Sequence, residues 1–228
     1  NSNLLFYLSY IFISLLIILT WLIFPNIVLL IFLIVASFHF GKEDTVFKVK
    51  KNFLLNEILF FFKGSSVIIA PLLFHRESTN EIFSTLNFYV FESTFFNNYL
   101  LMIFLILSFL SSICLSIGKS ADLKNIMILD YFSIIILNLF LTPVLAFTIY
   151  FCFLHSIRHS LSLINEMDRS FKKGLKKFII KALPLTLITG LFFLISIYFL
   201  NNLYKIDEAI YKVIFIGLAS LTFPHILL

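Results

Sequence analysis

Long apolar runs separated by short polar breaks fill most of this chain of 228 residues. Cutting the sequence at charged residues and at Pro, Gly and Asn gives eight runs: residues 4–24, 26–40, 53–74, 98–117, 123–141, 143–164, 178–200 and 206–228. Most are close to the roughly 20 residues with which an α-helix crosses a hydrocarbon core. Backbone groups in lipid must find hydrogen bonds within the chain, so such runs fold as helices. The pattern predicts an all-α, polytopic membrane bundle of about eight transmembrane helices.

Composition agrees with a membrane class, because 61% of the residues are hydrophobic and only 13% are charged. Soluble domains have roughly 45–50% apolar and about 25% charged residues. This excludes soluble enzyme folds, coiled coils, disordered tails and nucleic-acid modules. We expect one integral-membrane domain over residues 1–228. Since the sequence starts at Asn1 and ends inside an apolar run, we expect it to be a fragment that lacks the native N-terminal segment.

Two regions need a separate interpretation. The second run is short, and we expect its helix to continue through Gly41 toward Asp44. Residues 76–97 have mixed polarity, which predicts a loop with an amphipathic helix at the membrane interface.

Basic residues are unevenly divided among the loops, and they are retained on the cytoplasmic side of a membrane. The loops after the second, fourth and sixth runs hold Lys42, Lys48, Lys50 and Lys51, then Lys119 and Lys124, then Arg169, Lys172, Lys173, Lys176 and Lys177. The intervening loops hold Arg76, no basic residue, and Lys205. The loops after the second, fourth and sixth runs, together with Asn1, are therefore expected to be cytoplasmic, in a multi-pass protein of the plasma membrane. The net charge of +5 comes from these short loops, where it sets the orientation in the membrane, so no nucleic-acid partner is expected.

Four of the five histidines lie inside apolar runs, where an ionisable side chain is costly and indicates a functional site. His155 and His159 are spaced i, i+4, which places both on one helix face, within reach of one metal ion. His39 and His225 lie in the second and eighth runs. His75, beside Arg76, is expected to be a solvated surface residue.

The depth of the four histidines supports one cluster. The second, sixth and eighth helices all run from outside to inside in the expected topology. At ~1.5 Å per residue, His39, His155, His159 and His225 lie ~18–28 Å along their helices. All four then fall in the cytoplasmic half of the membrane.

A cluster of neutral imidazoles suits iron, copper or zinc, and the pattern does not choose among them. His39, His155 and His159 are the expected ligands. His225 follows Pro224 and is either a fourth ligand or a pocket residue. Metal-bound histidines commonly donate their second ring proton to a carboxylate, for which Asp44, Glu43 and Asp130 are candidates. Arg158 either pairs with one of these acids or extends toward the membrane surface.

Three segments together match the pattern of a known family: residues 38–44 (FHFGKED), 155–159 (HSIRH) and 224–228 (PHILL). In this order on eight helices they resemble the Brp/Blh-type bacterial and archaeal β-carotene 15,15′-dioxygenases. Tyr7, Trp21 and Pro25 are also similar, so the resemblance covers most of the chain.

The resemblance implies a membrane enzyme that uses Fe(II) and O₂ to split the central double bond of β-carotene into two molecules of retinal. It implies that His39, His155 and His159 bind the iron, and that a microbial rhodopsin is a possible recipient of the retinal. Members of the family also carry a histidine in an N-terminal Gly-x-x-His-Gly-type motif, which this sequence lacks. The missing ligand is expected in a lost N-terminal segment; the alternatives are that His225 completes the site or that the chain is inactive.

Other functions remain as alternatives. A membrane desaturase or hydroxylase resembles this pattern in its His-x-x-x-His boxes, but such dinuclear sites use about eight histidines and this chain has five. A non-catalytic protein that binds haem or a carotenoid is the other candidate, and haem would give a Soret band. A transporter is expected to have repeated halves with broken helices, which the sequence does not show.

Overall fold

The computed structural model describes residues 2–45, 47 and 53–227, and within these residues the chain is helical, without strands. Eight of the helical segments are long and apolar enough to cross a membrane, which confirms the prediction from the apolar runs. The elements are α1 (Ser2–Ile23), α2 (Pro25–Glu43), α3 (Phe53–Phe74), α4 (Arg76–Thr85), η1 (Val90–Glu92), α5 (Asn98–Leu115), α6 (Ala121–Phe140), α7 (Pro143–Ile149), η2 (Tyr150–Ser156), α8 (Ile157–Met167), α9 (Phe171–Leu200) and α10 (Ile206–Leu227).

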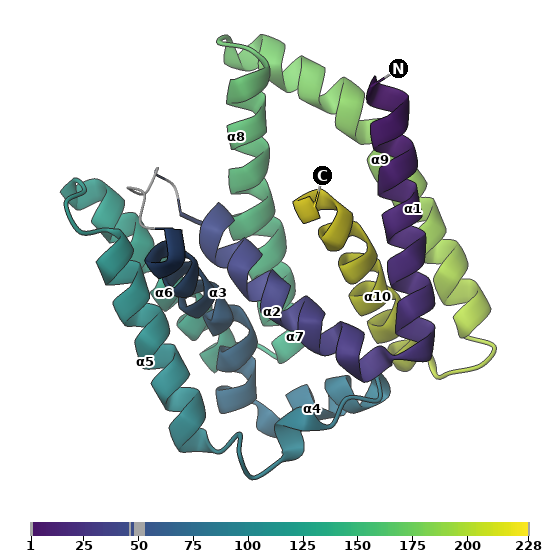
Figure 1. The fold of residues 1–228 in the computed structure, drawn as a ribbon, viewed down its shortest axis with the longest axis horizontal. Helices are drawn as coiled ribbons and strands as arrows, with labels where there is room; N and C mark the ends of the chain where they lie inside the picture. Colours follow the sequence, from purple (N-terminus) through teal and green to yellow (C-terminus); the bar gives the residue numbers. More distant parts are fainter. Residues whose placement is uncertain (1, 46, 48–52, 228) are drawn as a thin grey trace.

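The long helices run alternately up and down (Figure 1). The start of α1 and the turns between α5 and α6 and between α8 and α9 lie at one end of the molecule, and α4 lies at the other (Figure 1). Lys48, Lys50 and Lys51, which contribute to the expected orientation, lie outside the described residues.

The best packed part of the bundle is formed by α2, α3 and α5, and it depends on small side chains. A Cβ added at Gly64 of α3 would lie 1.9 Å from the carbonyl oxygen of Ser37, and one at Gly41 of α2 would lie 1.8 Å from that of Phe60. Glycines therefore allow the two backbones to approach closely, as is common between membrane helices. On the other side of α3, the hydroxyl of Ser108 donates to the carbonyl of Lys63 at 3.0 Å.

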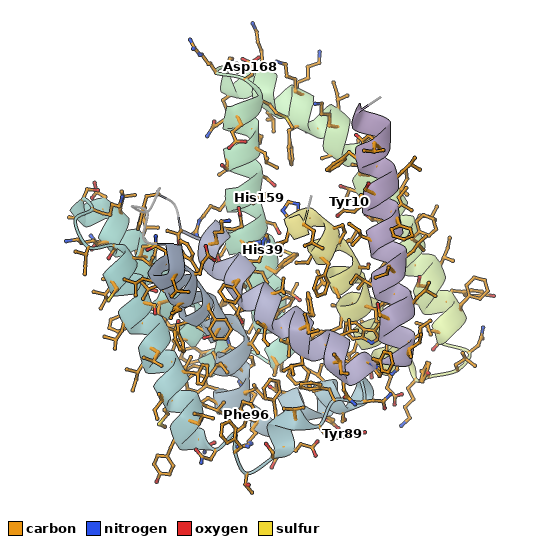
Figure 2. All side chains as sticks on the ribbon, viewed as in Figure 1. Tyr10, His39, Tyr89, Phe96, His159 and Asp168 are labelled. Carbon is orange, nitrogen blue, oxygen red and sulfur yellow. The ribbon has the colours of Figure 1, made fainter. Side chains whose placement is uncertain are left out.

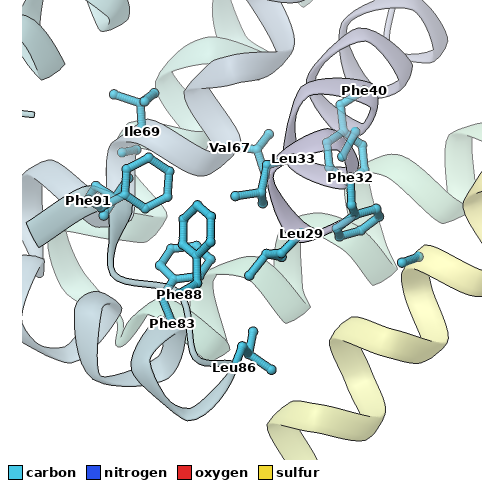
Figure 3. Packing of buried hydrophobic residues seen from close by; sticks show 14 of the residues in the cluster. Leu29, Phe32, Leu33, Phe40, Val67, Ile69, Phe83, Leu86, Phe88 and Phe91 are labelled. Atoms are coloured by element: carbon cyan, nitrogen blue, oxygen red, sulfur yellow. The ribbon is translucent and has the colours of Figure 1, made fainter. Parts of the chain in front are cut away.

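The hydrophobic core lies between these helices and the α4 region (Figure 3). Leu29 of α2, Leu72 of α3 and Phe88 after α4 are almost completely buried. The amphipathic helix expected in residues 76–97 is present as α4. Phe83 of α4 and Phe91 of η1 pack into the protein core, and the position of α4 at the membrane interface stays a prediction. His75 was expected to be a solvated surface residue, but it is half-buried, and its Nε2 has no hydrogen-bond partner in the described structure.

Two apolar runs fold differently from a single regular helix. The sixth run is continuous from Pro143 to Met167, but its middle part, η2, is a π-helix of seven residues. The seventh helix begins at Phe171, seven residues before the expected start, because the basic segment ahead of the apolar run is helical as well. Pro184 lies inside this helix. Figure 1 shows that the first part of α9 crosses the end of the molecule before the helix turns down along the bundle.

α1, α9 and α10 form a more open side of the bundle. α1 contacts α10, where the hydroxyl of Tyr10 donates to the carbonyl of Leu221 at 2.9 Å. Among the described residues of α9 only Gly174 is buried, and large apolar side chains such as Leu187 and Phe192 are exposed. A helix with so many exposed large apolar side chains is unusual in a soluble monomer. It is compatible with a multi-pass membrane protein.

Candidate metal centre

Four helical segments bring four histidine rings together. The centroid of the His39 ring, from α2, lies 5.4 Å from that of His155 in η2 and 5.6 Å from that of His225 in α10. The ring of His159, from α8, lies 5.8 Å from that of His225. Figure 2 shows the positions of His39 and His159 in the middle of the molecule, near the end of α2. Four side chains separated by up to 186 positions in the sequence thus form one cluster.

The cluster is closed on one side and open on the other. His155 is 6% exposed, His39 and His159 are half-buried, and His225 is exposed. The exposed edge of the cluster is therefore formed by His159 and His225.

Carboxylates from the end of α2 hold the outer nitrogens of two of these rings. Nδ1 of His155 lies 2.9 Å from Oδ1 of Asp44, and Nδ1 of His159 lies 3.3 Å from Oε2 of Glu43. A proton donated from Nδ1 to a carboxylate leaves the lone pair of Nε2 free for a metal ion. Burial raises the pKa of the Asp44 carboxyl, while the hydrogen bonds from His155 and Tyr150 lower it; the net result is a pKa below the usual value.

Asp44 has a second donor, because the hydroxyl of Tyr150 donates to its Oδ2. Tyr150 and His155 are five residues apart, at the start and near the end of the π-helix η2. In a π-helix the backbone bond joins residues i and i+5. In an α-helix, at 3.6 residues per turn, residues five apart point about 140° away from each other. The wider turn therefore explains how both side chains contact one carboxylate.

Aromatic rings surround His155 on the closed side. The ring of Phe40 meets it edge-on at 5.0 Å, and the ring of Phe151 stacks on it at 5.6 Å. Phe40 also contacts Tyr150 at 5.6 Å. These apolar rings exclude water from the buried end of the cluster, which strengthens the polar contact between His155 and Asp44.

A second charged group lies directly behind Asp44. The guanidinium of Arg158 forms two hydrogen bonds of 2.9 and 2.7 Å to Asp130 of α6, and it lies 3.8 Å from Asp44. Of the two interpretations of Arg158, the structure has the ion pair. Lys63 of α3 is buried and donates to the hydroxyl of Thr45 at 3.0 Å.

A cavity of about 20 Å³ separates these groups, and its lining includes Asp44, Lys63, Asp130 and Tyr150. That volume is enough for one water molecule with several polar partners.

The donor set fits a transition-metal ion in its chemistry, although its atoms are not gathered around one point. In the described residues no three His, Cys, Asp or Glu side chains have their ligand atoms already arranged for a metal ion. No ring contact between His155 and His159 is recorded in this part of the chain either; they are linked through His39 and His225. Four imidazoles with carboxylates on two outer nitrogens are nevertheless the groups with which iron, copper or zinc is bound.

Sequence reasoning missed two residues of this region. Lys63 is an ionisable residue inside an apolar run, which is itself a signal of a functional or structural polar group. Tyr150 carried no signal, because its role depends on the π-helix and apolar periodicity does not reveal one.

Comparisons with known proteins identify the family of the chain. The model of the family "Beta-carotene 15,15'-dioxygenase" matches residues 1–228. A protein of that name from uncultured marine bacterium 66A03 is 30% identical over 211 residues, which cover 92% of this chain and 74% of the relative. No solved structure matches the chain. With a family match over these residues and a histidine cluster inside an all-helical bundle, the chain belongs to the beta-carotene 15,15'-dioxygenase family.

Proposed function

We propose that this chain is an integral-membrane, Fe(II)-dependent dioxygenase that uses O₂ to cleave the central double bond of β-carotene into two molecules of retinal. Family membership supports carotene as the substrate. The observation that carries the proposal is the cluster of His39, His155, His159 and His225, with carboxylates on the outer nitrogens of two rings. The reaction adds one oxygen atom to each of the two alkene carbons, so the atoms balance without another reactant.

His39, His155 and His159 are the proposed iron ligands. His225 is the proposed fourth ligand or the residue that borders the open position. Bound iron supplies the redox chemistry by which O₂ reacts with a polyene. Asp44 and Glu43 keep the protons of His155 and His159 on Nδ1, which leaves the lone pairs of both Nε2 atoms free for the metal ion.

The protein environment restricts what reaches the site. Phe40 and Phe151 cover the buried face of His155 and keep water from that side. β-Carotene dissolves only in the hydrocarbon part of a bilayer, so we propose that it enters sideways, between helices, on the open side near His225. Exposed apolar side chains of α10 near His225, such as Leu221 and Ile226, match an apolar polyene.

The proposed location is the plasma membrane, with the cluster in its cytoplasmic half. Eight apolar helices support a multi-pass arrangement. The basic start of α9, with Lys172 and Lys173, supports a cytoplasmic position for that end of the bundle. Retinal leaves into the lipid, where a microbial rhodopsin is a suitable recipient.

Expression in a bacterium that accumulates β-carotene tests the proposal. We expect retinal to appear, measured by chromatography, as the carotene colour fades. His155→Ala is expected to abolish both changes. His75→Ala is the matched control, because His75 lies outside the cluster.

Metal analysis separates the iron assignment from the substrate assignment. We expect iron to co-purify with the chain and with His75→Ala, and to be lost from His155→Ala. Folded protein that binds iron but makes no retinal contradicts the reaction. Retinal formation with copper or zinc in place of iron contradicts the metal.

A further inference from the structure

The first part of α9, residues 171–183, is a cationic segment with few partners, and we call it the basic arm. It contains five lysines, and no acidic residue occurs between Asp168 and Asp207. Lys177 pairs with Asp168 at 2.7 Å. In the part of the chain that the structure describes, the other four lysines of the arm have no recorded ion pair or hydrogen bond: Lys172, Lys173, Lys176 and Lys181. Four positive charges are thus available to a partner outside the protein.

The arm is fixed to the protein by its opposite face. Gly174 is its buried residue, and a Cβ at that position would lie 2.3 Å from the carbonyl oxygen of Ile164 in α8. At about 100° per residue, Phe178 and Lys181 lie within about 40° of Gly174 around the helix, whereas Lys172 and Lys176 lie about 160° away. This close contact with α8 sets which face of the arm points outward.

A shallow, open groove lies on the outward face of the arm, away from Gly174. It has a volume of about 300 Å³ and is lined by Lys172, Leu175, Lys176, Ile179 and Ile180. Two ammonium groups therefore border three apolar side chains. This combination suits a molecule that has an anionic group joined to a hydrocarbon chain, because each part meets its complement.

The position of the arm points to the same kind of ligand. Figure 1 shows that it crosses one end of the molecule, the end at which α1 begins, before α9 turns down along the bundle. Pro184 lies directly after the arm and removes a helix hydrogen bond, which favours such a bend. In the proposed topology this end meets the cytoplasmic leaflet, whose anionic lipids attract basic segments.

We propose that the basic arm binds an anionic phospholipid of the cytoplasmic leaflet. Its phosphate lies between Lys172 and Lys176, and its acyl chain follows Ile179 and Ile180. Lys173 and Lys181 add attraction to neighbouring headgroups. The proposal rests on the membrane location in the proposed function, but it does not depend on carotene cleavage.

Lipid retention tests the site directly. The purified chain is exchanged into nanodiscs of phosphatidylcholine with or without phosphatidylglycerol, and the lipids that stay bound after mild detergent extraction are counted by native mass spectrometry. Lys172→Gln/Lys176→Gln removes the two groove charges. Lys124→Gln/Lys205→Gln is the matched control, since it removes two exposed lysines elsewhere and gives the same net charge.

We expect the wild type and the control pair to retain phosphatidylglycerol in preference to phosphatidylcholine. The groove pair is expected to bind it at least tenfold more weakly, from about fivefold for each lysine near an anionic surface. Equal losses in the two pairs show diffuse attraction and overturn the site. Equal retention of the two lipids by the wild type also overturns it.

A labelling experiment on the wild type needs no variant and guards against misfolding. Lys172 and Lys176 should react more slowly with an amine-directed ester in discs that contain phosphatidylglycerol, while Lys124 reacts at the same rate in both kinds of disc. Unchanged labelling of the groove lysines contradicts the proposal. Wild type that does not enter discs at all contradicts the membrane location instead, so the two failures are distinguishable.

Discussion

Gly64→Ala tests whether the close approach of α2 and α3 positions the metal centre. The added Cβ would lie 1.9 Å from the carbonyl oxygen of Ser37 and 2.5 Å from the backbone nitrogen of Gly41. Both are backbone atoms, so a side-chain rotation cannot relieve the clash. Ordinary contact begins near 3.4 Å, so one helix must move by about 1.5 Å.

The displacement would move His39, because His39 lies between Ser37 and Gly41 on the same helix. A misplacement of about 1 Å in a catalytic group can lower a rate about 100-fold, which corresponds to about 2.7 kcal/mol in activation free energy. Overpacking of a tight contact also lowers the free energy of unfolding, by about 1–3 kcal/mol. We therefore expect Gly64→Ala to make retinal about 100-fold more slowly and to unfold more easily in detergent.

The assay compares initial rates of retinal formation with thermal unfolding of the same samples, at a temperature where the variant is still folded. Gly217→Ala in α10 is the matched control, because nothing lies within 4 Å of a Cβ at that position. It should keep its rate within about twofold, since alanine is a better helix former than glycine. If Gly64→Ala keeps more than half of the wild-type rate and its stability, the helix contact does not position His39 and the reasoning is wrong.

Four further outcomes are expected. Tyr150→Phe leaves Asp44 without one hydrogen-bond donor. It should lower the free energy of unfolding in detergent by about 1.5–3 kcal/mol and weaken iron binding about tenfold. Unchanged iron affinity would show that Tyr150 does not hold Asp44 and His155 in place. Asp130→Asn breaks the partly exposed pair with Arg158 and should cost about 1–2 kcal/mol, measured in the same way; no loss would mean that the pair is well solvated. His225→Ala should retain more iron than the other cluster variants, because its ring is exposed, and complete loss would identify it as a full ligand. Removal of metal with a chelator should stop retinal formation, and Fe(II), but not Zn(II), should restore it.

The fold could be predicted further than the site. Apolar runs of spanning length specify membrane helices because a lipid environment leaves the backbone few other structures. The start of α9 was harder to predict than its end at Leu200, because the lysines there are good helix formers that a search for apolar runs discards. α4 was expected at a lipid interface, yet periodicity reports only that Phe83 lies on an apolar face and does not say whether lipid or protein covers it.

Within the site, the residue types that carry metal chemistry were visible in the sequence. His39, His155, His159 and His225 stand out as ionisable groups in apolar surroundings, and the structure brings them together. The contacts among them were not visible, because each depends on the rotation of a helix about its axis. Tyr150 illustrates this limit, since its contact with Asp44 requires a helical turn that differs from the regular one.

The π-helix also has a consequence for engineering and for alignment. A π-helical turn contains more residues than an α-helical turn, so η2 corresponds to an α-helix with one inserted residue. This insertion shifts the register of α8 relative to α7. Deleting one exposed residue, such as Phe153, would restore the α-helical turn without removing any histidine or carboxylate. All proposed ligands would remain in the sequence, and Tyr150 and His155 would then be four residues apart, about 40° around an α-helix, so both would still face Asp44. The five-residue spacing from Tyr150 to His155 therefore marks the π-helix, and an alignment of this segment must allow a gap of one residue.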